Sequence, residues 1–277
     1  MAGRGARVKV PPPRKSLGQH FLSDPEVLRR IVEASGVQPG EAVLEIGPGP
    51  GGLTRALSDA SAEARALEAD ERRVEYLAGL RLPGVRVEHA DALEVDYREL
   101  ARAAGGPFRL VANLPYNISG PLIAKLLRER AAFRSMTVML QKEVAERLLA
   151  PPGTKARGRL SVMTQAFCRI RPVLRVSAGA FRPRPKVDSE VVHLDVLERP
   201  VALLDDEATL WRTTAFGFGQ RRKMLRNSLK AAGPTAEDAL AAAELSGTER
   251  AEELTAEAWI RLANAFFTLA LREEEPP

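Results

Sequence analysis

The stretch AVLEIGPGPGGLT, residues 42–54, decides the fold. Its first five residues form a mostly apolar run typical of a buried strand, and the next six are all glycine or proline, which favours a tight loop. A helix is expected from Leu53. Gly47, Gly49 and Gly52 have the G-x-G-x-x-G spacing that lets a nucleotide-containing ligand approach the backbone. The stretch therefore predicts a strand, a ligand-binding loop and a helix in succession.

Strand and helix patterns alternate along the following sequence. Further strands are expected at residues 64–69, 85–89, 108–113, 136–141 and 190–198. Strands that alternate with helices of roughly 10 to 15 residues predict the α/β class, a mostly parallel sheet with helices on both faces. Ligands of such sheets bind at the carboxyl ends of the strands. After Pro200 the pattern is helical to about Leu271, which predicts a small all-α domain.

Two helix starts are predicted from capping residues. Ser23 is followed by Pro25 and Glu26, the pattern of a capping box, so a helix is expected to about Ala34. Ser119 is expected to cap a second helix, which carries an apolar stripe.

The composition excludes several classes of protein. The lone Cys168 excludes an internal disulfide framework and a cysteine cluster for zinc, and no metal site is expected. The sequence contains no apolar run of about 18 residues and no secretory signal, so no membrane partner is expected. These features predict a cytoplasmic protein.

Basic residues are concentrated in three parts of the chain, which has a net charge of +5. Residues 1–23 carry five Lys or Arg and residues 147–187 carry ten, with no acid in either segment, and residues 220–230 add five more. Such segregation suits a polyanion whose counterions are released on binding, although a solubilising surface would look similar at any one cluster. Together the clusters indicate a nucleic-acid partner.

Two acids follow strands near the glycine loop. Glu68 ends the second strand about 20 residues after the loop, the position at which an acid accepts hydrogen bonds from ribose hydroxyls. Asp91 follows the third strand, where it could accept a hydrogen bond from an adenine amine or cap a helix. Either a dinucleotide or S-adenosylmethionine would use this arrangement.

The string NLPY, residues 113–116, ends the fourth strand. The exocyclic amine of adenine is a weak nucleophile and needs acceptors that draw it toward tetrahedral geometry. The side-chain oxygen of Asn113 and the carbonyl of Leu114 could supply two acceptors, with Pro115 fixing the turn. Tyr116 could stack on an unpaired base. A structural turn whose tyrosine packs on the sheet is the alternative.

Five motifs together resemble the KsgA-type ribosomal RNA adenine dimethyltransferases, in order from about residue 15 to residue 270. They are SLGQHFLSD (16–24), LEIGPGPGGLT (44–54), NLPYNIS (113–119), FRPRPKVDS (181–189) and FGQRRKMLRNSLK (218–230). The resemblance implies a Rossmann-like class I methyltransferase domain, a small helical domain and S-adenosylmethionine as cofactor. It also implies dimethylation of two adjacent adenosines in a hairpin loop near the 3′ end of small-subunit ribosomal RNA, during subunit assembly.

The resemblance also implies roles for individual residues. His20 and Leu22 would close the pocket over the methionine part of the cofactor, and Phe181 would be the second aromatic wall of the target-base pocket, opposite Tyr116. The other implied cofactor contacts are Gly47, Gly49, Glu68, Asp91 and Asn113. Core packing is the alternative for Phe181.

The predicted organisation is a flexible basic arm at residues 1–15, the methyltransferase domain at 16–200 and an RNA-binding helical domain at 201–277. Arg221, Arg222 and Lys223 are expected on a helix of the last domain, where they could hold phosphates or form a solvated face. The protein is expected to be a monomer that acts on the immature small ribosomal subunit.

Three other functions remain open at this point. An Erm-type enzyme acting on large-subunit RNA would share the NLPY motif. A non-catalytic RNA-binding assembly or transcription factor could keep the fold without the chemistry. A nicotinamide-dependent oxidoreductase would explain the glycine spacing but neither NLPY nor the basic clusters.

Overall fold

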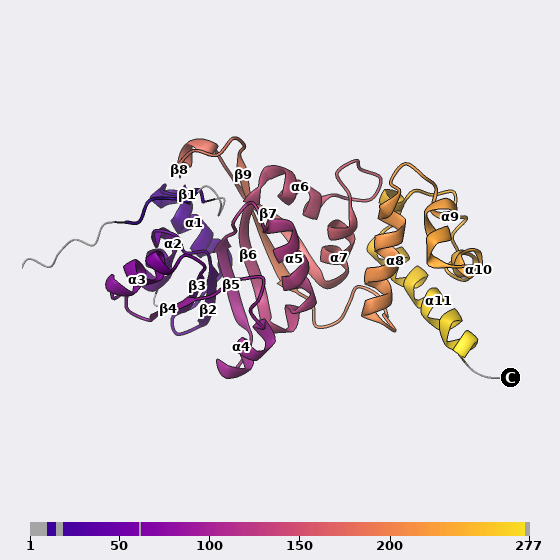
Figure 1. Cartoon of the computed structure of the whole chain (residues 1–277), viewed down its shortest axis with the longest axis horizontal. Coiled ribbons are helices and arrows are strands. Elements are labelled where there is room, and N and C mark those ends of the chain that lie inside the picture. The colour runs from indigo at the N-terminus through magenta and orange to yellow at the C-terminus, as the bar shows by residue number, and fades with distance from the viewer. Residues whose placement is uncertain (1–9, 15–18, 61, 275–277) are drawn as a thin grey trace, which may run out of the picture. The chain divides into compact units, whose positions relative to one another are not determined.

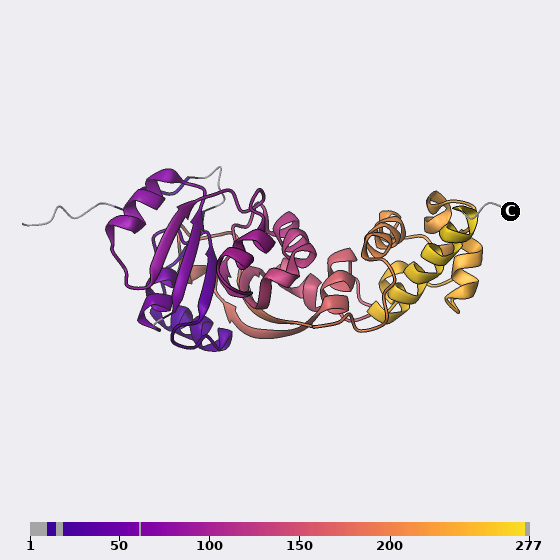
Figure 2. The ribbon, with the colours of Figure 1, turned by 90° about the horizontal axis from the view of Figure 1, so that it is seen from below.

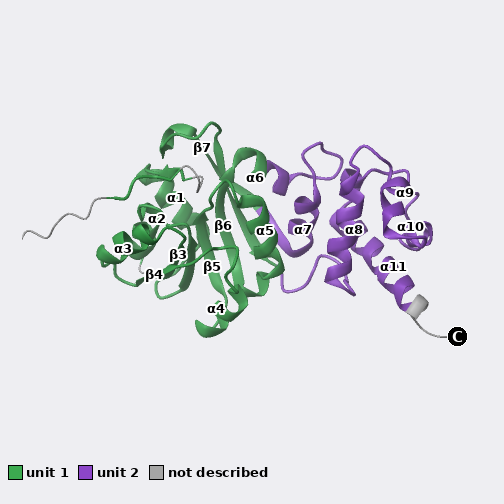
Figure 3. Cartoon of the chain, in the orientation of Figure 1, with its two compact units in different colours: residues 1–145, 171–196 green, residues 146–170, 197–277 purple. Residues whose placement is uncertain are grey.

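A computed structural model of the protein describes residues 10–14, 19–60 and 62–274, and the chain divides into two compact units (Figure 3). The sheet unit contains the described residues up to Ala145 together with Arg171–Val196, and the helical unit contains Glu146–Ile170 and the described residues from Leu197 onward. The predicted boundary at residue 200 lies just beyond Val196. The sequence did not show that Glu146–Ile170 joins the helical unit, because this depends on packing between segments far apart in the chain.

A sheet of seven strands forms the centre of the sheet unit (Figures 1 and 2). The first five strands in the spatial order are parallel, and β9 pairs antiparallel with β6. In this order the strands are β4 (Val85–His89), β3 (Glu63–Glu68), β2 (Ala42–Ile46), β5 (Phe108–Asn113), β6 (Phe133–Gln141), β9 (Ser189–Val196) and β7 (Cys168–Val176). The predicted α/β fold class is confirmed.

Helices lie on both sides of the sheet (Figure 2). They are α1 (Pro25–Ser35), α2 (Gly52–Asp59), α3 (Glu71–Gly79), α4 (Tyr97–Ala103), α5 (Ser119–Arg128) and α6 (Lys142–Leu149). Helix α1 packs on β5, β6 and β9, and α2 packs on β3. Ile31 and Leu57 from these helices and Val43 and Val111 from the strands are fully buried in one apolar cluster. Burial of this apolar surface fixes the strand ends that carry the candidate site.

Both predicted helix caps were wrong. Asp24, not Ser23, is the N-cap of α1, because its extended backbone lets Oδ1 accept hydrogen bonds from the Glu26 and Val27 amides. The Ser23 hydroxyl instead donates to the Ala180 carbonyl. Helix α5 begins at Ser119 itself, whose hydroxyl donates to the Tyr116 carbonyl.

A second sheet of two short strands was not predicted. Strand β1 (Phe21–Leu22) pairs antiparallel with β8 (Phe181–Arg182), with Leu22 opposite Phe181. The Ser23 amide continues the contact by donating to the Ala180 carbonyl. Strands of two residues have no readable periodicity, so only the folded chain reveals that FRPRPKV lies against the segment before α1.

The helical unit consists of helices that pack around α11 and α8. They are α7 (Arg159–Phe167), α8 (Glu207–Gly219), α9 (Leu225–Ser228), α10 (Ala236–Ala242) and α11 (Ala256–Glu274). Short 3-10 turns also occur in the chain, at Arg130–Ala132, Ala178–Ala180, Leu229–Ala232 and Ala251–Glu253. Trp259 of α11 is fully buried, and its ring stacks on Phe218 with centroids 5.5 Å apart. The predicted helical carboxyl-terminal region is confirmed.

Gly217→Ala is expected to lower the free energy of unfolding by about 1–3 kcal/mol, because the added methyl group would overpack the core of the helical unit. An ideal Cβ at residue 217 would lie 2.2 Å from Cη2 of Trp259. Urea denaturation of the full chain measures the change. Gly219→Ala is the matched control in the same helix, because a Cβ there meets nothing within 4 Å. Equal effects of the two substitutions would contradict the prediction.

Candidate active site

A cavity of about 260 Å³ lies at the carboxyl ends of the parallel strands, the place where sheets of this kind bind ligands. The loops after β2, β3, β4 and β5 line it together with the segment Gln19–Phe21. The predicted site residues that line this cavity are His20, Gly47, Gly49, Glu68, Asp91, Asn113, Leu114, Pro115 and Tyr116. The fold thus brings together residues that are up to about 100 positions apart in the sequence, because parallel strands end at one edge.

The glycine loop requires glycine at the first two glycine positions of the motif, residues 47 and 49. Gly47 and Gly49 have φ values of +70° and +58°, which side chains with a Cβ rarely adopt. A Cβ on Gly49 would lie 2.7 Å from the ring of Phe21. The Gly47 amide donates to the Leu67 carbonyl at 2.9 Å, which holds the loop against β3. The loop is therefore a close backbone wall of the cavity.

Glu68 is oriented by the backbone. Its side chain is buried, and its two oxygens accept hydrogen bonds from the Gly49 amide at 3.1 Å and the Asp70 amide at 2.9 Å. Burial raises the pKa of Glu68, while these amides and the positive charge of Arg73 lower it. Each carboxylate oxygen keeps a further lone pair, so Glu68 can still accept hydrogen bonds from a ligand diol.

Asp91 lies at the exposed rim of the cavity. Its Oδ1 accepts from the Leu93 amide at 2.8 Å, and its carbonyl accepts from the Glu94 amide. It therefore caps a turn rather than a helix, since α4 begins at Tyr97 with Asp96 as its N-cap. The second carboxylate oxygen has a lone pair available for an amine at the cavity rim.

Asn113 presents an acceptor without a partner. Its Nδ2 donates to the His20 carbonyl at 3.2 Å, which orients the amide, and its Oδ1 is buried with no hydrogen-bond partner among the described residues. A buried acceptor left unpaired costs about 1–3 kcal/mol. Such an atom in a cavity wall is where a ligand donor is expected.

Tyr116 packs between two rings. Its ring stacks on His20 with centroids 5.5 Å apart and meets the edge of Phe181 at 6.5 Å. Its hydroxyl is 2.5 Å from the Ser189 hydroxyl, and burial raises the pKa of Tyr116. In this structure His20 therefore covers one face of Tyr116.

Phe181 and Leu22 do not line the cavity. Both side chains are buried, with exposed fractions of 0% and 7%, and they belong to the apolar cluster under α1. The predicted second aromatic wall is thus a core position in this structure, with only its ring edge against Tyr116. The physical reason is that β1 and β8 turn these two side chains into the apolar core of the sheet unit.

Sequence analysis missed two buried ionisable residues next to the site. Glu45 is buried within β2, and burial raises its pKa to about 8, so the carboxyl is protonated at neutral pH. An acid inside the apolar run AVLEI was the available signal. Arg73 of α3 is fully buried, with its guanidinium carbon 4.3 Å from the centroid of the Phe21 ring. No sequence pattern marked it, because a single arginine in a polar helix is ordinary.

Arg221, Arg222 and Lys223 do not lie on a helix, so that prediction was wrong. Helix α8 ends at Gly219, and the three residues form the loop before α9, which is called the basic loop below. Arg221 donates to the carbonyls of Lys155 and Arg157 at 2.7 Å each. Arg222 and Lys223 are exposed. The glycines near the end of α8 and the backbone of Gln220 explain why the helix stops.

Among the described residues, no group of three or more His, Cys, Asp or Glu side chains is placed to hold a metal ion. None of the helices described is both long and apolar enough to cross a bilayer.

Comparison with known proteins identifies the family. Residues 12–267 match the family model described as ribosomal RNA adenine dimethylase. A Rhodospirillum rubrum protein named ribosomal RNA small subunit methyltransferase A is 49% identical over 257 residues, covering 91% of this chain and 87% of that protein. The protein of the same name from Magnetococcus marinus is 45% identical and covers 91% of both chains.

Two solved structures are also similar. A dimethyladenosine transferase from Plasmodium falciparum has a TM-score of 0.77 and 26% identity, covering 90% of this chain and 98% of the other. The 23S rRNA methyltransferase ErmE has a TM-score of 0.65 and 28% identity, covering 89% and 99%. With the family model matching nearly the whole chain, the protein belongs to the ribosomal RNA adenine dimethylase family.

Proposed function

We propose that this protein transfers methyl groups from S-adenosylmethionine to the exocyclic amine of two adjacent adenosines in a hairpin loop near the 3′ end of small-subunit ribosomal RNA. The observation that carries the proposal is the buried, unpartnered Oδ1 of Asn113 in the wall of the cavity. An adenine amine is a donor that would satisfy this atom. The substrate would be the immature small subunit in the cytoplasm. Support for the small subunit comes from the relatives at 45–49% identity, which are named ribosomal RNA small subunit methyltransferase A.

The residues of the cavity fit the cofactor. Glu68 would accept hydrogen bonds from the ribose hydroxyls, and Asp91 would accept one from the cofactor adenine. The backbone of Gly47 and Gly49 permits close approach, and the left-handed φ values at both positions support this use. The loop contains two prolines and is packed against Phe21, so it leaves little room for a pyrophosphate. This favours S-adenosylmethionine over a dinucleotide.

The chemistry relies on placement and hydrogen bonding. S-adenosylmethionine supplies an electrophilic methyl carbon, so positioning of the amine is the main demand on the protein. Asn113 Oδ1 and the Leu114 carbonyl accept the two amine hydrogens and make the nitrogen lone pair available. These two acceptors would hold the amine toward the methyl carbon that the bound cofactor supplies, and the proton lost from the amine would leave to water. Tyr116 would stack on the target base.

Incubation of the protein and S-adenosylmethionine with small subunits that lack these methylations tests the proposal. Nucleoside mass spectrometry is expected to detect dimethyladenosine in the small-subunit RNA. Large subunits treated in the same way serve as the control, and modification there alone would favour a 23S rRNA methyltransferase like ErmE. Binding of the particle without dimethyladenosine would instead indicate a non-catalytic assembly factor.

A further inference from the structure

Arg73 is a buried cation next to the cavity that has no role in the chemistry above. It lies in the first turn of α3, and none of its side chain is exposed. Its Nε and Nη1 atoms have no hydrogen-bond partner among the described residues. Its Nε lies 3.8 Å from the carboxylate of Asp70, and both side chains of this ion pair are buried. A buried ion pair is costly to desolvate and often contributes no more stability than well-packed apolar side chains of similar volume. The presence of arginine here therefore calls for a functional reason.

The other partners of Arg73, apart from Asp70, belong to the segment that precedes α1. Its Nη2 donates to the Pro11 carbonyl at 2.9 Å and contacts Oε1 of Gln19 at 3.4 Å. The Arg14 amide donates to the same Gln19 oxygen at 2.8 Å. The guanidinium also lies 4.3 Å from the centroid of the Phe21 ring, a cation–π distance. Gln19 and Phe21 both line the cavity.

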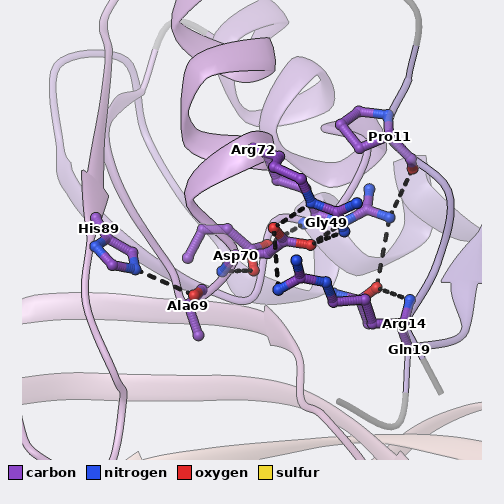
Figure 4. Close-up of polar contacts among 10 residues, drawn as sticks. Pro11, Arg14, Gln19, Gly49, Ala69, Asp70, Arg72 and His89 are labelled. Carbon is purple, nitrogen blue, oxygen red and sulfur yellow. Dashed lines mark hydrogen bonds and ion pairs between the residues drawn. The ribbon is translucent and has the colours of Figure 1, made fainter. Parts of the chain in front are cut away.

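These contacts connect Arg73 to the glycine loop and to Glu68, which border the proposed cofactor site. Phe21 packs on Gly49, whose amide donates to Glu68, and Glu68 is a negative charge that interacts with Arg73. Figure 4 shows the polar part of this arrangement, with Asp70 between Arg14 and Arg72. The guanidinium of Arg73 thus contacts the Phe21 ring, which packs on the glycine loop. It also interacts electrostatically with Glu68, which borders that loop.

We propose that Arg73 is a positioning residue for the cofactor, which fixes the Gln19–Phe21 wall of the cavity and balances the charge of Glu68. The inference rests on the proposed function, since it assigns Glu68 to the ribose. It also explains why a charged side chain is kept in the contact between α3 and Phe21. An apolar residue could support the ring but could not act on Glu68.

The charged groups around Glu68 determine how its pKa would change if Arg73 were lost. Burial raises the pKa, the Asp70 and Gly49 amides and the charge of Arg73 lower it, and the charge of Asp70 raises it. Glu45 is also close, but its carboxyl is neutral at pH 7. Arg14 and Arg72 pair with Asp70 rather than with Glu68. Loss of Arg73 would therefore raise the pKa of Glu68 further, so that protonation removes an acceptor as the pH falls.

Isothermal titration of S-adenosylmethionine into Arg73→Met tests the inference. Methionine keeps the length and apolar contact with Phe21, so the variant is expected to fold. The dissociation constant is expected to rise about tenfold at neutral pH, the loss of one interaction with a charged group. The ratio of variant to wild-type constants should grow as the pH is lowered, because without the charge of Arg73 the pKa of Glu68 is higher and its carboxylate takes up a proton at a higher pH in the variant than in the wild type.

Two further variants test whether the effect depends on the charge at residue 73. Arg72→Met removes the same charge from the neighbouring position, where the side chain pairs with Asp70 and is 41% exposed, and is expected to change the constant less than about threefold. Arg73→Lys keeps the charge and should restore the wild-type pH dependence even if affinity stays reduced. Hydrogen exchange of the β1 amides in the absence of cofactor should increase in Arg73→Met and not in Arg72→Met.

Three outcomes would overturn the inference. They are wild-type affinity in Arg73→Met, equal losses in Arg72→Met and Arg73→Met, and a loss in Arg73→Met that does not depend on pH. A wild-type protein that does not bind S-adenosylmethionine would instead contradict the proposed function. The wild-type titration therefore separates failure of the inference from failure of the function on which it rests.

Discussion

Asn113→Ala is expected to lower the rate of methyl transfer about 10²- to 10³-fold, the range seen when one preorganised hydrogen-bonding group is removed from an active site. The substitution deletes the Oδ1 acceptor, which has no partner among the described residues and therefore is free for the target amine. It also deletes the bond from Nδ2 to the His20 carbonyl. Single-turnover kinetics on small subunits lacking the modification measure the chemical step.

The free energy of unfolding of Asn113→Ala is the control, because it shows whether the loss of turnover comes from a destabilised fold. Loss of the bond to His20 destabilises the fold, while removal of a buried unpaired oxygen offsets this, so the free energy of unfolding should change by less than about 1 kcal/mol. RNA affinity should stay at the wild-type value, because phosphate contacts supply most of it. Retained turnover at saturating cofactor would exclude the acceptor role.

The parts of the fold that were predictable are those with local patterns. AVLEI, VRVEH and FRLVA each form the expected strand because an apolar run bounded by loop residues is a local signal. The predicted cavity residues follow from the same patterns, since parallel strands bring their carboxyl ends together. Glu68, Asp91 and Asn113 could therefore be predicted at one edge before their distances were known.

The parts that were not predictable depend on contacts between distant segments. The pairing of β1 with β8 buries Phe181, and the stacking of His20 on Tyr116 follows from it. Ser23 has a capping pattern, but its amide and hydroxyl both donate to the carbonyl of the distant Ala180, and Asp24 is the N-cap instead. Arg73 illustrates the same limit, because nothing near it in sequence indicates that Pro11 and Phe21 will surround it.

Arg222→Ala combined with Lys223→Ala is expected to weaken binding of the ribosomal RNA hairpin about tenfold near physiological salt. Two cations that contact phosphates release counterions, so the slope of log affinity against log salt should flatten by about 1.4, as for a single-stranded target. Both side chains are exposed in the basic loop and are free to reach phosphates. Arg221 is left in place because its guanidinium holds the Lys155 and Arg157 carbonyls, and its loss would disturb the loop itself.

A matched variant separates local contact from total charge. Arg30→Ala with Arg261→Ala removes the same charge from two exposed positions outside the three basic segments, and the salt slope should then keep its wild-type value. Fluorescence anisotropy over 50–300 mM salt, about the range in which such slopes are measured, compares the two variants. Cofactor affinity should be unchanged in both. An equal slope in wild type and in the basic-loop variant would mean that Arg222 and Lys223 form a solvated surface and that phosphates are bound by the other basic segments.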